Sequence, residues 1–212
     1  MLQLLVTGFG PFPGVPENPS ERLAHVLANE PPPGWSARAR VLSVAFARVG
    51  PELDAALAEG ACDLVLGLGV HRGPYLRIER RARRDPTAQR PDNDGTPGVA
   101  VPRTEDTPFA RATELELAPL LAALSGAPAT WPRPSGDAGG YVCEHTYYHL
   151  LGAARAHGAR GLFVHVAPTR HLPLALQARA LRCLVVAAGA QLCGAAPSAA
   201  NQAERAARSQ PS

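Results

Sequence analysis

Short apolar segments typical of buried strands alternate along this 212-residue chain with segments of helical periodicity. The apolar segments are Leu2–Thr7, Leu64–Gly69 and Gly161–Val166. Apolar residues recur three and four positions apart in Pro51–Leu57 and again in Leu174–Ala188, as in amphipathic helices. This order predicts an α/β fold, a single-domain three-layer α/β/α sandwich with a mostly parallel twisted sheet and helices on both faces. We expect the active site at the carboxyl ends of the strands.

Composition favours one domain without special partners. With 46% hydrophobic residues the chain can form one substantial core, so we expect a catalytic domain over residues 1–193 and a poorly packed tail over 194–212. The formal net charge of +3 does not indicate nucleic acid or a membrane surface. No apolar run could span a bilayer and no signal-peptide pattern is present, which predicts a cytoplasmic protein. The four cysteines lack zinc-site spacings, so free thiols are expected, without a metal or a cofactor.

Three further segments have recognisable patterns. Ser20 is expected to cap a helix, and Val41–Phe46 is a candidate strand. Tyr75–Arg83 alternates like a half-buried strand that can pair antiparallel at the sheet edge. Proline, glycine and polar residues from Asp85 to Thr107 predict a long loop that serves as a lid or binding loop.

Cys143 is the most informative residue for chemistry, because it follows a glycine turn and opens a helical segment. Gly139 and Gly140 permit the sharp turn and close ligand approach that a nucleophile between strand and helix requires. A helix N-terminus, with an imidazole in reach, would lower the pKa of the thiol. Cys143 also falls on the apolar stripe of its helix, so a purely structural role is the alternative.

A thiol that cleaves amides needs a histidine to move protons and a group that orients the histidine. His165 lies at the carboxyl end of an apolar strand segment, a position that favours function over a hydrogen-bonded core histidine. Glu79 is the best orienting acid, because it is the carboxylate within a strand-like pattern. The five arginines between Arg77 and Arg84 can equally neutralise Glu79 in a surface salt bridge. The residues alone leave both interpretations of Glu79 open.

Motifs from about Leu5 to Pro168 together resemble the type I pyroglutamyl peptidases, in family order and at similar spacing. The opening resembles that family's T-G-F-x-P-F followed by N-P-S, with Thr7-Gly8-Phe9-Gly10-Pro11-Phe12 and Asn18-Pro19-Ser20. The other matching segments are Ile78-Glu79-Arg80, Pro91-Asp92-Asn93 with Gly95, Ala138-Gly139-Gly140-Tyr141-Val142-Cys143, and Gly161 to Val166.

The resemblance implies a metal-free cysteine peptidase that removes an N-terminal pyroglutamyl residue from peptides. It makes Cys143 the nucleophile, His165 the general base and acid, and Glu79 the third member of a triad. Peptides with N-terminal pyroglutamate are then the partners, and a homo-oligomer is expected because family members often form one.

The resemblance assigns pyroglutamate recognition to Phe9 and Phe12 and places Tyr141 and Val142 along the same pocket. Pyroglutamate is a small uncharged lactam, which suits an apolar slot with backbone donors and acceptors. Either phenylalanine alone would be interpreted as a core aromatic, although a loop rich in glycine and proline is an unusual place for core.

Several positions depart from the family pattern. Leu68 stands where many members carry a Gln, so one polar contact to the substrate is expected to be missing. Glu144 replaces the Asn that often follows the cysteine, and its charge would oppose a lowered thiol pKa. The family's arginine near the reaction centre falls on Gln89, next to Arg90, and either can support the oxyanion only as a weak candidate. The backbone N–H of Cys143 is the natural first donor.

Other functions stay open at this point. The departures also suit a catalytically weak or inactive relative that binds a small amide ligand, and the triad also suits an amidohydrolase acting on another small amide. The arginines from Arg77 to Arg84 could bind nucleic acid, but only Tyr75 supplies an aromatic residue beside them.

Overall fold

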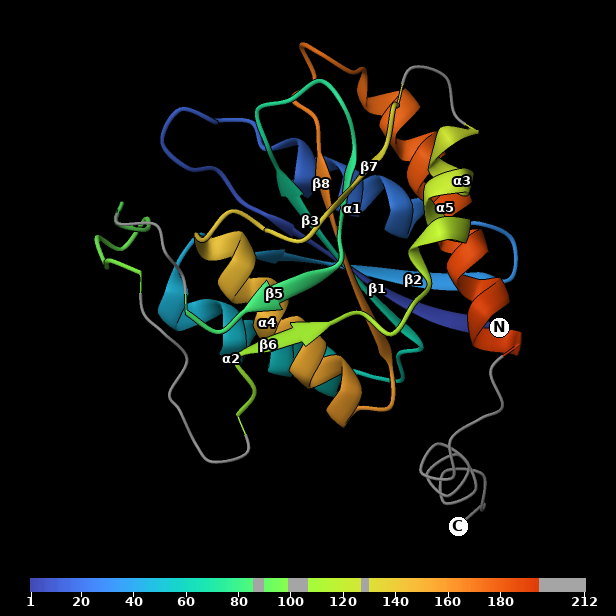
Figure 1. Ribbon diagram of the computed structural model, residues 1–212, viewed down its shortest axis with the longest axis horizontal. Coiled ribbons are helices and arrows are strands. Elements are labelled where there is room, and N and C mark those ends of the chain that lie inside the picture. The colour runs from blue at the N-terminus through green and yellow to red at the C-terminus, as the bar shows by residue number, and fades with distance from the viewer. Residues whose placement is uncertain (86–89, 99–106, 127–129, 195–212) are drawn as a thin grey trace.

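A six-stranded sheet with the order β2-β1-β3-β8-β4-β7 forms the centre of the computed structural model, which describes residues 1–85, 90–98, 107–126 and 130–194 (Figure 1). The strands β2, β1, β3 and β8 run parallel, β4 is antiparallel to β8, and β7 is parallel to β4. The strands are β1 (Leu2–Phe9), β2 (Trp35–Leu42), β3 (Leu64–Val70), β4 (Arg77–Glu79), β7 (Arg133–Ser135) and β8 (Arg160–Val166). The mostly parallel sheet is therefore confirmed.

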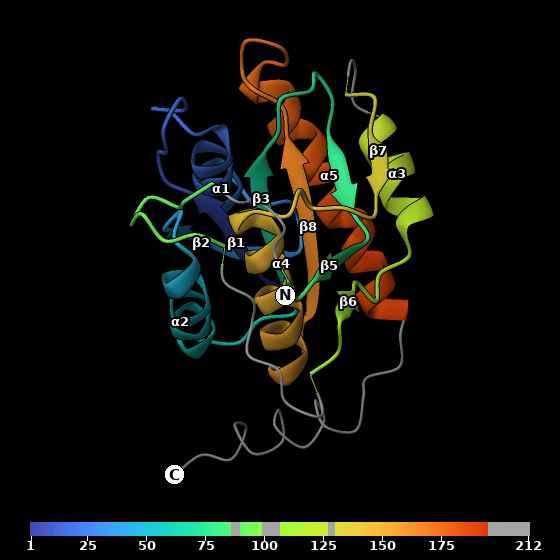
Figure 2. The same ribbon diagram turned by 60° about the vertical axis from the view of Figure 1, so that its left-hand side comes forward.

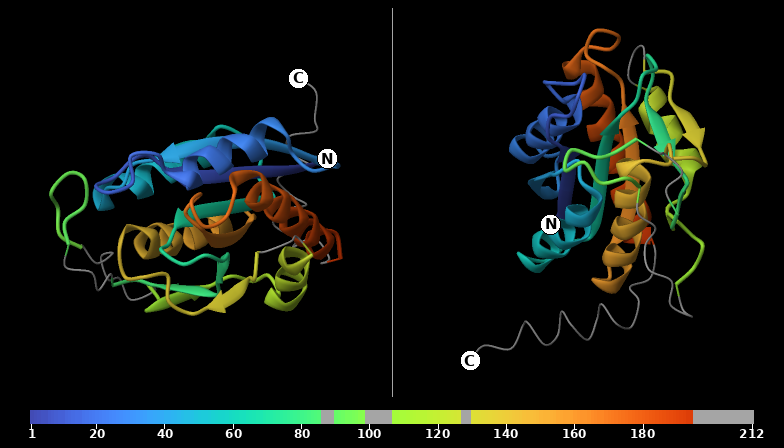
Figure 3. Two further views of the ribbon diagram at one scale, coloured as in Figure 1. Left: turned by 90° about the horizontal axis from the view of Figure 1, so that it is seen from above. Right: turned by 90° about the vertical axis from the view of Figure 1, so that its left-hand side faces the viewer.

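Helices cover both faces of this sheet, which confirms the three-layer sandwich (Figure 3). One face carries α1 (Pro19–Asn29), α3 (Leu117–Ser125) and α5 (Leu174–Gly194). The other carries α2 (Phe46–Ala58) and α4 (Val142–Ala156), and a small antiparallel pair, β5 (Arg81–Arg83) and β6 (Ala110–Ala112), packs against α4. Alternate residues of the central strands enter the two cores, because successive side chains point to opposite faces.

Two of the predicted strands are placed differently. The predicted strand Val41–Phe46 is right only for its first two residues: β2 ends at Leu42, and Phe46 begins α2, where its N–H donates to Asp92 Oδ2 at 2.7 Å. The segment Tyr75–Arg83 is divided after Glu79, so that β4 and β5 belong to different sheets. The antiparallel pairing of β4 is confirmed, but β4 is not at the edge, because β7 covers it.

Asn18, and not Ser20, caps α1. The Asn18 Oδ1 atom accepts from the N–H of Ser20 at 3.1 Å and from its hydroxyl at 2.8 Å, and Asn18 Nδ2 donates to the carbonyl of Gly10 at 3.0 Å. The Ser20 hydroxyl in turn accepts the N–H of Phe9 at 3.0 Å. A side chain at Gly8 would lie 2.3 Å from the carbonyl oxygen of Ser20, so only glycine fits there. These contacts fix the loop between β1 and α1.

The C-terminal helix α5 extends to Gly194, six residues beyond the expected end at Ala188. Apart from Gly194, the predicted tail over 194–212 lies outside the described residues. Among the residues that are described, no helix is long and apolar enough to cross a membrane.

Candidate active site

Cys143 is the second residue of α4, directly after the predicted glycine turn. Gly139 and Gly140 both have positive φ angles, 97° and 64°, which L side chains rarely adopt. The turn brings the start of α4 to the carboxyl ends of β3 and β8, where the loops after the parallel strands gather (Figure 2). Topology therefore places the thiol at the end of the sheet where the sequence predicts the active site.

The sulfur of Cys143 occupies the space that a side chain at Gly69 would need. A Cβ atom at Gly69 would lie 2.9 Å from Cys143 Sγ and 3.0 Å from the ring of Phe163. Gly69 on β3 is the register partner of His165 on β8, and adjacent strands lie about 4.8 Å apart. The sulfur and the imidazole therefore share one face of the sheet at neighbouring positions. Sequence reasoning did not single out Gly69, although a glycine inside an apolar strand is a known sign of close approach.

His165 and Glu79 form a buried pair. The distance from His165 Nδ1 to Glu79 Oε1 is 2.7 Å, and the two residues are 3% and 0% exposed. A surface salt bridge is therefore the wrong interpretation of Glu79. We assign the Nδ1 proton to this contact, because the carboxylate can only accept, and the assignment leaves Nε2 as the basic nitrogen.

Arg77 is a site residue that the sequence analysis missed. Its Nε atom donates to Glu79 Oε1 at 2.6 Å, and its Nη2 atom lies 3.4 Å from His165 Nδ1. Burial lowers the pKa of His165, Arg77 lowers it further, and Glu79 opposes both. The imidazole is therefore kept neutral at ordinary pH. The signal for Arg77 was its position two residues before Glu79, on the same face of a strand.

The expected lowering of the thiol pKa is wrong. Desolvation by burial, followed by the negative charge of Glu79, raises the pKa of Cys143 to about 12. Arg90, Arg77 and the backbone at the helix start act in the opposite direction but are weaker. The resting site thus holds a neutral thiol beside a neutral imidazole.

Glu144 is not among the groups that shift the pKa of the Cys143 thiol, although its charge suggested that it would be. It is fully buried, and Arg83 neutralises it through the backbone N–H at 2.8 Å and through Nε and Nη2 at 3.2 and 3.1 Å. Glu144 also accepts the N–H of Gly140 at 2.8 Å, while Asp137 accepts the N–H of Gly139 at 2.9 Å and contacts Arg83 at 2.7 Å. This network holds the glycine turn in front of Cys143.

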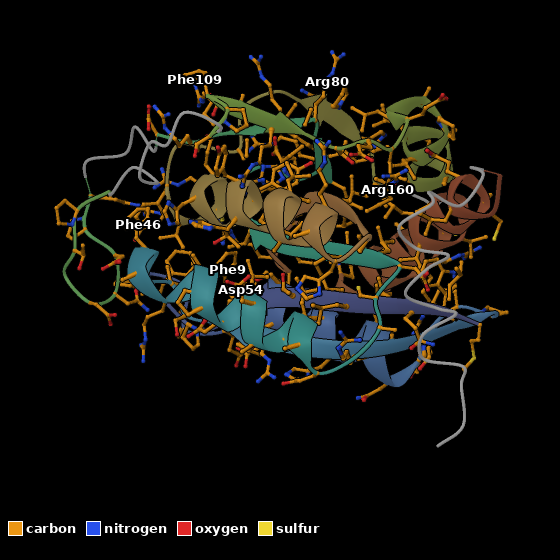
Figure 4. All side chains as sticks on the ribbon, turned by 90° about the horizontal axis from the view of Figure 1, so that it is seen from below. Phe9, Phe46, Asp54, Arg80, Phe109 and Arg160 are labelled. Atoms are coloured by element: carbon orange, nitrogen blue, oxygen red, sulfur yellow. The ribbon has the colours of Figure 1, made fainter. Side chains whose placement is uncertain are left out.

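The four predicted pocket residues fall into two pairs. Phe9 and Val142 are 3% and 1% exposed and belong to the apolar core beneath the site, and Figure 4 shows Phe9 inside the molecule. Phe12 and Tyr141 are half-buried and pack on that core. Arg90 lies over the ring of Tyr141, with its guanidinium carbon 3.8 Å from the ring centroid.

The described part of the predicted lid is anchored beside this pocket. Asp92 is 7% exposed, and its Oδ1 atom accepts the N–H groups of Asp94 and Thr96 at 3.0 and 2.9 Å. Asn93 Nδ2 donates to the carbonyl of Pro11 at 2.9 Å, which joins the lid to the loop that carries Phe12. The P-D-N motif therefore positions the loops around the site.

Of two further departures from the family pattern, only Leu68 is placed by the structure. Leu68 is fully buried in the core under α1 and α5, because even-numbered residues of β3 point to that face and the neighbours of Cys143 to the other. The expectation that Leu68 replaces a polar substrate contact is therefore wrong. Gln89 lies outside the described residues.

Most of the arginine cluster is occupied with carboxylates. Arg77, Arg83 and Arg84 pair with Glu79, Glu144 and Asp85 respectively. Arg80 and Arg81 are exposed, and Arg80 projects from the surface in Figure 4. Within the described part of the chain, no group of three or more His, Cys, Asp or Glu side chains could hold a metal ion.

Comparison with known proteins gives one consistent result. A family model described as pyroglutamyl peptidase matches residues 2–176. The pyrrolidone-carboxylate peptidase of Streptomyces coelicolor is 37% identical over 206 residues, covering 89% of this chain and 92% of the relative. That of Deinococcus radiodurans is 35% identical over 183 residues, 84% of each chain.

Solved structures agree with this result. Pyrrolidone carboxyl peptidase from Thermococcus litoralis superimposes with a TM-score of 0.81 at 26% identity, over 88% of this chain and 93% of that one. Pyroglutamyl peptidase I from Bacillus amyloliquefaciens has the same TM-score and identity, over 90% and 98% of the two chains. The similarity spans nearly the whole described fold.

Proposed function

Because the chain belongs to the pyroglutamyl peptidase family, as its motifs indicated, we propose that it cleaves the amide bond after an N-terminal pyroglutamyl residue with Cys143, His165 and Glu79 as its triad. Members of the family are cysteine peptidases that act on such peptides. The observation that supports the triad best is the sulfur seated over Gly69, whose register partner His165 is bonded to the buried Glu79.

The reaction begins with proton transfer, because both partners are neutral at rest. His165 Nε2 removes the thiol proton as Sγ attacks the carbonyl carbon of pyroglutamate. The oxyanion is met by the backbone N–H of Cys143 at the start of α4, and Arg90 can add positive charge. His165 then gives its proton to the leaving amine, and the amine departs from a pyroglutamyl thioester.

Water completes the cycle. His165 takes a proton from the water that attacks the thioester carbonyl, and the thiol recovers that proton as pyroglutamate leaves. Glu79 accepts a hydrogen bond from the Nδ1–H group throughout, so it fixes the ring orientation and stabilises the imidazolium that forms twice per turnover. Arg77 holds Glu79 in place.

The lactam is proposed to lie against Phe12 and Tyr141, the two predicted pocket residues with accessible surface. Phe9 and Val142 support them from beneath. A flat, uncharged ring gains from such aromatic walls without a charged partner.

A panel of aminomethylcoumarin reporters tests the proposal directly. We expect wild type and Cys62→Ala to release the fluorophore from the pyroglutamyl reporter but not from the prolyl or glutaminyl reporter, and Cys143→Ala to release none. Cys62 is a suitable control because it is a half-buried free thiol whose pKa is also raised, to about 11. Release by Cys143→Ala would refute the nucleophile. A preference for another reporter would favour a different amidohydrolase, and no turnover at all would favour a binding protein.

Two expectations remain predictions. A homo-oligomer is expected from the family, and light scattering after gel filtration measures the assembly directly. A cytoplasmic location is expected from the sequence, and fractionation of the source cells tests it.

A further inference from the structure

A cavity of about 530 Å³ opens at the same end of the sheet as the triad. Its walls come from the loop after β1, the ends of β3 and β8, and Arg90. Figure 2 shows the loops that follow these three strands side by side at one end of the molecule. The volume falls within the range of pockets that bind small ligands or short peptide segments.

His71 connects this cavity to the triad. It lines the cavity two residues after Gly69, and its ring centroid lies 6.1 Å from that of His165. The N–H of Gly73 donates to His71 Nδ1 at 3.2 Å, and His71 Nε2 lies 2.6 Å from the carbonyl of Tyr75. These contacts fix a neutral tautomer with the proton on Nε2. His71 is therefore an uncharged wall between His165 and the cavity.

The position of the cavity fits the leaving side of a peptide. His165 must protonate the departing nitrogen, so the residues after pyroglutamate extend past His165 and toward His71. The lactam lies against Phe12 and Tyr141, and Phe12 also lines the cavity. The two subsites therefore share one wall, as consecutive parts of one peptide require.

The cavity carries positive charge that no described carboxylate balances. Arg72, Arg90 and Arg170 line it, and none of the three makes an ion pair with a residue in the described part of the chain. The one acidic residue in the lining, Glu17, contacts Arg22 at 3.5 Å instead. By contrast, Arg77 and Arg83 next to the triad are both paired with buried acids.

We propose that this arginine-lined cavity binds a carboxylate of the peptide that follows pyroglutamate, and so favours acidic or very short leaving peptides. The inference rests on the proposed peptidase function. Guanidinium groups recognise carboxylates through paired N–H donors, and a concave site strengthens the attraction. The carboxylate belongs either to an Asp or Glu side chain or to the C-terminus of a short peptide.

Matched peptides separate the two sources of the carboxylate. Pyroglutamyl-aspartyl-alanine amide is compared with its asparagine and lysine counterparts, and pyroglutamyl-alanyl-alanine acid with its amide. We expect kcat/KM to be about fivefold higher for at least one acidic member than for its neutral counterpart, and lowest for the lysine peptide. The preference should weaken in high salt, because exposed charges are screened.

Variants test whether the cavity is the cause. The double variant Arg72→Met with Arg170→Met should lose the preference while hydrolysing pyroglutamyl aminomethylcoumarin, which has an uncharged leaving group, at the wild-type rate. Arg155→Met is the matched control, because Arg155 is an exposed arginine in the last turn of α4, at the other end of that helix from Cys143. Arg90 is kept, since it also packs on Tyr141.

The outcomes are distinct. Equal rates for acidic, neutral and basic peptides, or a preference that survives in the double variant, would overturn the inference while the reporter still supports the peptidase. Wild type that hydrolyses no pyroglutamyl substrate would overturn both. A preference confined to the aspartyl peptide identifies a side-chain carboxylate as the ligand, and one confined to the free acid identifies the chain end.

Discussion

Two buried glutamates flank Cys143, the proposed nucleophile, and they differ in what they contact. Glu79 and Glu144 are both 0% exposed, and each is bonded to an arginine. Glu79 presents its Oε1 atom to the imidazole of His165, whereas Glu144 bonds to Arg83 and to the backbone N–H of Gly140. The same residue type therefore contacts the imidazole on one side of Cys143 and holds the backbone on the other, and in the proposed mechanism only the first takes part in proton transfer. Burial and charge pairing alone do not distinguish a catalytic acid from a structural one.

The electrostatic reach of the two glutamates also differs. Glu79 raises the pKa of the Cys143 thiol, second only to burial, while Glu144 is not among the groups that shift it. Glu144 acts on the imidazole instead, because its charge is among the groups that raise the pKa of His165. For the pKa of the thiol, the charge of Glu144, next to Cys143 in sequence, is thus less important than the charge of Glu79, which lies on another element.

Glu79→Gln should give the largest effect, a loss of kcat/KM of roughly a hundredfold with little loss of stability. Glu79 Oε2 is buried without a hydrogen-bond partner among the described residues, so the amide group fits and its oxygen can still accept from His165. The lost charge lowers the pKa of His165, so the acid limb of the pH profile should move to lower pH. Reporter kinetics across pH and a thermal melt measure both; an unchanged kcat/KM would contradict the role of Glu79.

Glu144→Gln should affect stability more than activity, the reverse of Glu79→Gln. Unfolding free energy should fall by about 2 kcal/mol, because both oxygens of Glu144 accept N–H groups and an amide NH2 cannot, whereas Glu79 Oε2 accepts none among the described residues. We expect kcat to fall less than about tenfold, since a side-chain oxygen can still accept from Gly140. Urea unfolding and reporter kinetics provide the comparison. A loss of activity as large as that of Glu79→Gln, in protein that melts normally, would show that the two glutamates are not different in kind.

The rate at which iodoacetamide alkylates Cys143 tests how differently Glu79 and Glu144 affect the pKa of the thiol. Because the pKa of the thiol is about 12, the rate for wild type should climb steadily from pH 7 to pH 10 without a plateau near neutrality. At a fixed pH the rate should rise severalfold in Glu79→Gln and stay unchanged in Glu144→Gln. The rate is followed by mass spectrometry of the Cys143 peptide in a Cys62→Ala background. A plateau below pH 8 would mean that the thiolate already forms at rest.

Arg77→Met should have the smallest effect, a shift of the acid limb of kcat/KM to higher pH. Arg77 lowers the pKa of His165, so without it the imidazolium persists to higher pH and the base is lost earlier as pH falls. Arg80→Met is the control, since Arg80 lies three residues away but is exposed. A shift to lower pH, or an equal shift in the control, would contradict the proposed influence of Arg77.

Local patterns carried much of the prediction. The alternation of strands and helices gave the fold class, and the glycine turn and the strand end pointed to Cys143 and His165 as candidates, because each signal lies within a few neighbouring residues. The residues alone left the role of Glu79 open, and only the family resemblance favoured it as the orienting acid. The structure explains why: Glu79 lies next to Arg77 as a salt bridge would, and only the pairing of β4 with β8 brings it to the imidazole.

Other features depend on contacts between distant segments and could not be predicted from pattern. The pKa of Cys143 is raised mainly by burial, and its sulfur lies over Gly69 of β3, which no local motif reports. The division between β4 and β5 falls at Arg80, whose N–H donates to the carbonyl of Ser135 at 2.7 Å and whose carbonyl accepts the N–H of Thr113 at 3.0 Å. The neutralisation of Glu144 likewise requires β5 to lie beside α4.

A rapid-quench experiment with a pyroglutamyl ester tests the central claim most directly, because an activated ester acylates faster than the thioester is hydrolysed. The account predicts a burst of alcohol equal to the enzyme concentration, and acid-quenched protein that carries a pyroglutamyl group on the peptide containing Cys143. Cys143→Ala should give neither. An adduct on another residue, or a burst that survives in Cys143→Ala, would contradict the assignment of the sulfur over Gly69 as the nucleophile.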